Sequence, residues 1–185
     1  MNIWLFFDLD EQDIKNKKVL DSPSGASSFI ATAQTKGIDV KGIDVLYQHS
    51  LEQLEKQGKR SIDKIYKDVS WMKGHSLDFY RSIENHRTHR EEALQAFVEH
   101  YNNNDYIFME LPKLDFPDDS FDLVLSSHLL FVYDDRFSCE FHKLSILEML
   151  RVSKEVRIFP LVDFQNKRME EKKNFSPYVY QIIEV

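Results

Sequence analysis

The chain has 185 residues, 42% of them hydrophobic and 30% charged, a globular composition and a length that suggest a single domain over residues 1–185. Its net charge of −7 argues against general nucleic-acid binding, and no apolar run approaches the roughly 20 residues that cross a bilayer. Cys139 is the only cysteine, which excludes an internal disulfide and favours a reducing, cytoplasmic location.

The first elements in chain order predict a strand–helix–strand unit. Residues 18–21 (KVLD) and 39–44 (DVKGID) are typical of short strands, and residues 27–36 are typical of a helix with one apolar face. Gly37 stands where a left-handed residue ends a helix. This order is that of a right-handed βαβ unit, which predicts the beginning of a parallel sheet.

Residues 47–104 form a long insertion that is predicted to be mostly helical. Two pairs within it match the capping box that begins a helix, Ser50 with Gln53 and Thr88 with Glu91. A direct crossover between parallel strands needs only about a dozen residues, so this segment is far longer than the connection requires. We expect it to cover a site at the carboxyl ends of the strands.

Two groups of side chains in the insertion have alternative interpretations. An aromatic group forms either a lid over the site or the insertion's own core, and consists of Trp71, Met72, Phe79 and Tyr80. A basic group either meets an anionic acceptor or forms a solvated helix face, and consists of Arg81, His86, Arg87, His89 and Arg90. The two histidines do not predict a metal site, because such a site needs three or four ligands of fixed geometry.

The second half of the chain predicts three further strands, over residues 106–110 (YIFME), 121–126 (FDLVLS) and 155–162 (EVRIFPLV). A helix over about 138–152 carries four large apolar residues, Phe141, Leu144, Leu147 and Leu150. Strands that alternate with helices predict an α/β fold: a Rossmann-like, mostly parallel sheet with helices on both faces and a helical insertion after the second strand.

The loop within VLDSPSGASSF, residues 19–29, limits the ligand class. A nucleoside triphosphate loop needs a Lys-Ser/Thr pair after its glycines, and none follows Gly25. A dinucleotide loop needs three glycines, whereas Pro23 and Ser24 precede a single one here. A ligand without phosphates that retains a ribose remains, and Asp44, at the end of the second strand, is placed either to bind ribose hydroxyls or simply to start a turn.

The ordered segments VLDSPSGASSF, GIDVLY and ELPKLDFPDDSFDLVLSSHLLF resemble class I S-adenosylmethionine-dependent methyltransferases, over residues 19–162. PSGASSF, SSHLLF and RIFPLVDF are most similar to an uncharacterised bacterial branch with no assigned substrate. The resemblance implies a Rossmann-like fold, S-adenosyl-L-methionine as cofactor and methyl transfer to a small-molecule acceptor. The chain departs from the family at Asp115, where proline is usual, and in having one loop glycine rather than two or three.

The resemblance also implies roles for individual residues. Asp21, Asp44 and Glu110 would give a cationic sulfonium an acidic lining. The implied contacts are Asp21, Ser22, Pro23, Ser24 and Gly25 for the methionine end, Asp44 for the ribose, Val45, Glu110 and Leu111 for the adenine, and Ser126 and Ser127 beside the sulfonium. His128 is the candidate general base if the acceptor must lose a proton; its alternative is a histidine packed at a strand end.

Two alternatives to methyl transfer stay open: a non-catalytic S-adenosylmethionine-binding or interaction module of the same fold, and a nicotinamide-dependent α/β enzyme. The resembled family adds a helix and an antiparallel strand pair after its fifth strand, whereas only 23 residues follow residue 162. We therefore expect shortened or missing C-terminal strands. A sheet that ends at its fifth strand exposes an edge, which favours a homodimer through that edge.

Overall fold

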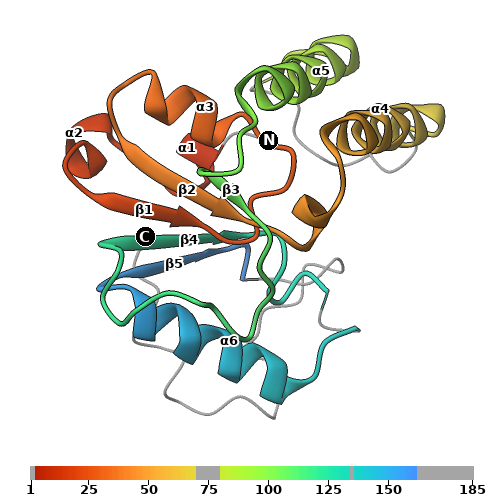
Figure 1. Cartoon of the computed structure of the whole chain (residues 1–185). Coiled ribbons are helices and arrows are strands. Elements are labelled where there is room, and N and C mark those ends of the chain that lie inside the picture. Colours follow the sequence, from red (N-terminus) through yellow and green to blue (C-terminus); the bar gives the residue numbers. More distant parts are fainter. Residues whose placement is uncertain (1–2, 70–79, 134–135, 162–185) are drawn as a thin grey trace.

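A computed structural model describes residues 3–69, 80–133 and 136–161. The described part contains a five-stranded sheet in the order β3-β2-β1-β4-β5, and each neighbouring pair is parallel (Figure 1). Its strands are β1 (Lys18–Asp21), β2 (Asp39–Ile43), β3 (Tyr106–Ile107), β4 (Leu123–Ser127) and β5 (Val156–Phe159). The protein therefore has the α/β, Rossmann-like fold predicted from the sequence.

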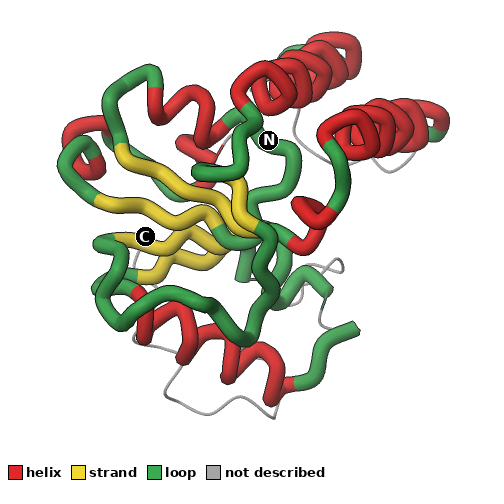
Figure 2. Tube along the Cα trace, viewed as in Figure 1, coloured by secondary structure: helices red, strands yellow, loops and turns green. Residues whose placement is uncertain are grey.

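Helices lie on both faces of the sheet, as predicted (Figure 2). Helices α1 (Ile3–Phe6) and α2 (Glu11–Ile14) precede β1, α3 (Phe29–Gln34) connects β1 to β2, and α6 (Cys139–Val152) connects β4 to β5. The insertion after β2 contains the 3-10 helix η1 (Val45–Gln48), α4 (Leu51–Lys67) and α5 (Ile83–His100). Figure 1 shows α4 and α5 side by side, on the side where the strands end.

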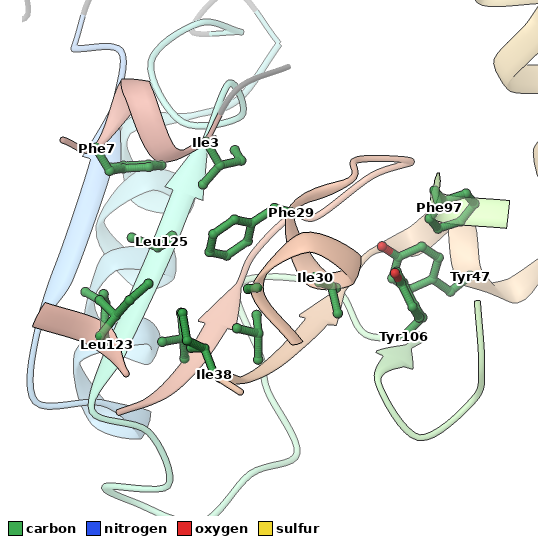
Figure 3. Packing of buried hydrophobic residues seen from close by; sticks show 14 of the residues in the cluster. Ile3, Phe7, Phe29, Ile30, Ile38, Tyr47, Phe97, Tyr106, Leu123 and Leu125 are labelled. Atoms are coloured by element: carbon green, nitrogen blue, oxygen red, sulfur yellow. The ribbon is translucent and has the colours of Figure 1, made fainter. Parts of the chain in front are cut away.

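The sheet is buried between two apolar clusters because neighbouring strand residues point to opposite faces. Val19 and Leu125 pack on the side of α3, where Phe29 is buried (Figure 3). Leu20 and Val124 pack on the other side, in the cluster that contains the α6 residues Ile146, Met149 and Val152. Coverage on both faces explains why successive apolar residues of β1 and β4 are all fully buried: Val19, Leu20, Leu123, Val124 and Leu125.

An aromatic cluster joins the insertion to the sheet. Phe97 of α5 is fully buried, with its ring centroid 5.2 Å from that of Tyr106 in β3 and 6.2 Å from that of Tyr47 in η1 (Figure 3). Ring pairs at these separations add about 0.5–1.5 kcal/mol each beyond the area that they bury. The insertion is thus packed onto the carboxyl end of β2 and onto β3.

Most predicted helix boundaries are confirmed. Ser50 and Gln53 form both hydrogen bonds of the capping box at the start of α4, and Gly37 ends the α3 turn with a φ of +75°. The second predicted capping box is wrong, because Thr88 lies inside α5 and its hydroxyl donates to the carbonyl of Glu84. Ser82 is the N-cap of α5 instead.

Strands β3 and β5 are shorter than predicted. β3 ends at Ile107, and the next residue, Phe108, is 53% exposed, so no neighbouring element covers an extension of this edge strand. β5 ends at Phe159 rather than at residue 162. The predicted shortening of the C-terminal strands lies outside the described residues, as do Trp71, Met72 and Phe79 of the predicted lid. Across the described helices, none has the length and apolar character of a membrane span.

Candidate functional site

A cavity of about 340 Å³ lies at the carboxyl ends of β1, β2 and β4, where the order of the strands reverses. Ligands of open α/β sheets bind at this switch point. The polar and charged side chains of its lining come from both the sheet and the insertion: Ser24, Ser27, Asp44, Tyr47, Gln57, Ser61, Arg90, Ser127, His128 and Tyr133. A larger groove of about 630 Å³ between α4 and α5 carries charges that are already paired, such as Arg87 with Asp63 and Glu91, so we assign the site to the smaller cavity.

Asp44 is 7% exposed and lines this cavity directly after β2. Its Oδ1 accepts the backbone N–H of Leu46 at 2.8 Å, which caps η1, and its Oδ2 accepts the N–H of Gly25 at 2.8 Å. Burial raises the pKa of the Asp44 carboxyl, while these two hydrogen bonds oppose the rise. Asp44 therefore does start a turn, and the same carboxylate also fixes the β1–α3 loop beside the cavity.

Asp21, the last residue of β1, is fully buried behind the cavity lining. Its Oδ2 accepts the hydroxyl of Ser24 at 2.8 Å, and its Oδ1 has no hydrogen-bond partner among the described residues. Burial, assisted by the nearby charge of Asp44, raises the pKa of Asp21 to about 7, against the opposing effect of the Ser24 hydrogen bond. Two acidic side chains thus meet at the ends of β1 and β2, one exposed to the cavity and one beneath it.

The position of Ser24 depends on a glycine in the neighbouring strand. A Cβ on Gly42 of β2 would lie 2.8 Å from both Cβ and Oγ of Ser24 and 2.5 Å from Cδ1 of Ile30. Only glycine allows the loop and α3 to approach β2 this closely. The loop is held further by the Tyr47 hydroxyl, which donates to the carbonyl of Gly25 at 2.7 Å.

The end of β4 supplies Ser127 and His128 to the cavity lining, whereas Ser126 is buried behind it. His128 has a φ of +58°, a left-handed conformation that non-glycine residues seldom adopt, and its Nδ1 is buried without a hydrogen-bond partner among the described residues. Burial, and secondarily the charge of Arg90, lower the pKa of His128. Its ring lies 5.2 Å from Phe6 and 5.6 Å from Phe159, measured between centroids.

The structure brings together only part of the predicted set. Pro23, Ser24, Gly25, Asp44, Ser127 and His128 line the cavity, whereas Asp21, Ser22 and Ser126 are buried and do not line it. The three predicted adenine contacts lie elsewhere. Val45 is 39% exposed, and Glu110 is exposed and forms an isolated backbone β-bridge with Lys113. Leu111 belongs to the apolar cluster on the α6 side. None of these three lines the cavity.

The wall formed by α4 and α5 was predicted as a covering insertion whose named candidates were the aromatic group and the basic group; the residues that α4 contributes were not named as a wall. Its contribution from α4 recurs at helical spacing, at Leu54, Gln57, Gly58, Ser61, Ile62 and Ile65. That spacing was a signal that could have found the wall, because residues three and four apart share one face of a helix. From α5 the wall takes Arg90, one member of the predicted basic group, together with Ala93, Leu94 and Phe97.

The two histidines of the basic group have local contacts. The Tyr66 hydroxyl is hydrogen-bonded to Nδ1 of His86, and His89 faces Glu92 at 3.5 Å on the exposed side of α5. Within the ranges that the structure describes, no group of three or more His, Cys, Asp or Glu side chains is arranged to hold a metal ion.

No family model matches the chain. Over 166 residues it is 33% identical to the uncharacterized protein MJ0045 of Methanocaldococcus jannaschii, an alignment that covers 88% of this chain and 75% of the archaeal protein. The similarity thus extends over most of both proteins, while the name of the relative assigns no activity. The chain belongs to the same family as the uncharacterized protein MJ0045 of Methanocaldococcus jannaschii.

Proposed function

We propose that the protein binds S-adenosyl-L-methionine in the cavity at the ends of β1, β2 and β4 and transfers its methyl group to a small-molecule acceptor. The observation that carries the proposal is Asp44, a buried carboxylate at the end of β2 that opens onto a cavity at the switch point of the sheet. An acidic side chain at this position is suited to ribose hydroxyls. A cavity of about 340 Å³ lies within the usual range for small-molecule sites.

The polar groups around the cavity fit a cationic ligand. Asp44 lines it, and Asp21 lies behind Ser24 with one carboxyl oxygen that no described residue satisfies. A positive charge nearby would favour the ionised form of both carboxyls, whose pKa values are raised by burial. The loop that includes Pro23 and Gly25 would hold the methionine end, and Ser127 would lie beside the sulfonium.

The same loop disfavours a phosphate-bearing cofactor. The N–H of Ser22 donates to the carbonyl of Leu125, that of Ser24 to Ile43, and that of Gly25 to Asp44. Pyrophosphate sites depend on backbone N–H groups that point at the ligand. Because these three N–H groups are engaged within the protein, the arrangement supports a ligand without phosphates over a nicotinamide dinucleotide.

When bound, the cofactor supplies an electrophilic methyl group on its sulfonium. The tasks left to the chain are to orient the acceptor and exclude water, and correct alignment contributes roughly 7–11 kcal/mol in favourable cases. Helices α4 and α5 would exclude water, because they form one wall of the cavity. His128 would accept a proton from an acidic acceptor group, since its lowered pKa keeps the imidazole neutral near neutral pH.

Calorimetric titration with S-adenosylmethionine and S-adenosylhomocysteine tests the proposal. The Ser61→Trp variant places a large ring at the cavity wall from an exposed helix position, and the matched control Arg60→Trp alters the neighbouring exposed position, which does not line the cavity. We expect both ligands to bind the wild type and the control but not Ser61→Trp. Absence of heat and of thermal stabilisation at millimolar ligand would contradict the proposal, and stabilisation by a nicotinamide dinucleotide would favour the oxidoreductase alternative.

Turnover separates methyl transfer from a second candidate, a non-catalytic S-adenosylmethionine-binding module. The second candidate is supported by His128, whose ring packs against Phe6 and Phe159. A metabolite mixture incubated with methyl-labelled cofactor measures the difference. Methyl transfer predicts a labelled product that Ser61→Trp fails to form, whereas the binding module predicts cofactor binding with no labelled product.

A further inference from the structure

Arg90 lines the cavity without a counter-ion among the described residues, whereas Arg87 of the same helix is paired. It is half-buried on α5 and lines the cavity, and its Nε is buried with no hydrogen-bond partner in the described part of the chain. No described carboxylate forms an ion pair with it. Arg87, one turn earlier, bonds Asp63 at 2.8 Å and Glu91 at 2.7 Å, so the acidic residues close to this stretch of α5 are already used.

A guanidinium with a buried and unsatisfied N–H is unfavourable, because the group has lost water without gaining an acceptor. No described residue of the cavity lining forms an ion pair with it. Asp44 is the sole carboxylate among the described residues of the lining, and its two oxygens accept the N–H groups of Gly25 and Leu46 rather than a guanidinium N–H of Arg90. A ligand in the cavity would supply the acceptor that the described residues do not provide.

The surroundings of Arg90 indicate a ligand group that carries a single negative charge. It is the one arginine or lysine among the described residues that line the cavity. A dianionic phosphate is usually bound by several cations or by a set of backbone N–H groups, and the loop N–H groups of Ser22, Ser24 and Gly25 are engaged. A carboxylate matches one guanidinium in both charge and planar geometry. Ser61 and Gln57 of α4 line the same cavity and add neutral hydrogen-bonding groups.

We propose that Arg90 binds the carboxylate of the methyl acceptor, so that the substrates of this protein are small monocarboxylic acids; this inference rests on the proposed function. Arg90 belongs to the inserted helix α5 and influences the titration of His128 at the end of β4. That end is where the acceptor is expected, whereas the methionine end of the cofactor is expected at the Pro23–Gly25 loop. Of the basic group of the insertion, Arg90 thus lines the proposed ligand cavity, whereas Arg87 forms ion pairs at the surface.

The test uses acetate, benzoate and indole-3-acetate, each beside its uncharged amide, titrated by calorimetry with and without saturating S-adenosylhomocysteine. Arg90→Met removes the charge, Arg90→Lys keeps it without the planar fork, and Arg87→Met is the control on the same helix. We expect the wild type and the control to bind at least one acid in preference to its amide, and Arg90→Met to lose about 10-fold or more in that affinity. If Arg90→Met fails to fold, Arg90→Lys takes its place in the test because it keeps the charge. Its affinity for the acid should be lower than that of the wild type.

Three results would overturn the inference. One is equal binding of acids and amides by the wild type. Another is tighter binding of inorganic phosphate than of every acid. The third is a loss of S-adenosylhomocysteine affinity in Arg90→Met with unchanged affinity for methylthioadenosine, which lacks the carboxylate; Arg90 would then hold the cofactor. The titration without cofactor separates this inference from the proposed function, because Arg90-dependent binding of acids in a protein that does not bind S-adenosylhomocysteine would refute only the latter.

Discussion

Asp21 is a site residue whose carboxyl changes its pKa when the protein folds. It is fully buried, and burial raises the pKa of its carboxyl from 3.8 to about 7. The folded protein therefore retains a proton that the unfolded chain releases at lower pH. The stability contributed by this proton is fully present below about pH 4 and is lost as the pH rises toward 7.

Asp21→Asn should remove this part of the pH dependence of folding. The amide keeps an oxygen that can accept the Ser24 hydroxyl but has no proton to lose. Between about pH 4 and pH 7, the free energy of unfolding of the wild type should fall relative to the variant by up to about 1.4 kcal/mol per pH unit. Urea unfolding across this range measures the difference, with the exposed Asp115→Asn as control. Parallel curves for wild type and Asp21→Asn would show that the buried carboxyl does not titrate in this window.

Asp44 and Glu110 show what sequence reasoning could reach at the residue scale. Asp44 was predictable because the carboxyl end of a parallel strand fixes both its place and its direction. The role predicted for Glu110 required the third strand to reach residue 110. β3 ends at Ile107, and Glu110 instead forms a local β-bridge with Lys113. Arg90 was identifiable as basic but not as unpaired, because pairing depends on which carboxylates the partner helix presents.

At the scale of single elements, the predicted starts of α4 and α5 can be compared directly, because both were predicted from the same capping-box pattern. Ser50 and Gln53 form a complete capping box at α4, whereas Thr88 is inside α5 despite the same sequence pattern. Ser50→Ala should cost about 0.5–2 kcal/mol of unfolding free energy, because it leaves the N–H of Gln53 in the first turn without its side-chain acceptor. Thr88→Ala should change stability by less than about 0.5 kcal/mol. Chemical denaturation of both variants checks this, and equal losses would contradict the assigned start of α5.

Helix α6 shows a limit of hydrophobic patterning. The apolar residues Leu144, Leu147 and Leu150 are 38–53% exposed, whereas the buried face includes Ser145 and Met149. Hydrophobicity alone would select the wrong face, because the solvent-facing side of this helix is as apolar as the side that packs on the sheet. Patterning therefore located the helix without giving its orientation.

The orientation of α6 can be tested with two truncations of similar size. Met149→Ala removes a fully buried side chain from the cluster beneath the sheet and should cost about 2–5 kcal/mol. Leu147→Ala removes a side chain that is 53% exposed and should cost less than about 1 kcal/mol. Thermal or urea unfolding measures both. A larger loss for Leu147→Ala would mean that this face is covered in the folded protein.

At the scale of the whole molecule, the parallel sheet was predictable and the site was predictable only in part. Alternating strands and helices specify a parallel sheet whose strands end at one edge, whereas the order β3-β2-β1-β4-β5 was not predicted. The cavity, by contrast, is closed by α4 and α5, whose packing depends on contacts such as that between Phe97 and Tyr106. Contacts between distant parts of the chain are not encoded in local periodicity.

The charge of the whole molecule gives a test that needs no substitution. The chain carries a net charge of −7, and such a field accelerates the arrival of cations over roughly 10 Å, a range that salt shortens. S-adenosylmethionine has one more positive charge than S-adenosylhomocysteine, while the two are otherwise nearly identical in shape. If the proposed function holds, the association rate of S-adenosylmethionine should fall as salt is raised, and that of S-adenosylhomocysteine should stay nearly constant. Stopped-flow mixing of each ligand with the wild type measures both rates, and an equal salt dependence would mean that the sulfonium charge is not sensed on the approach to the cavity.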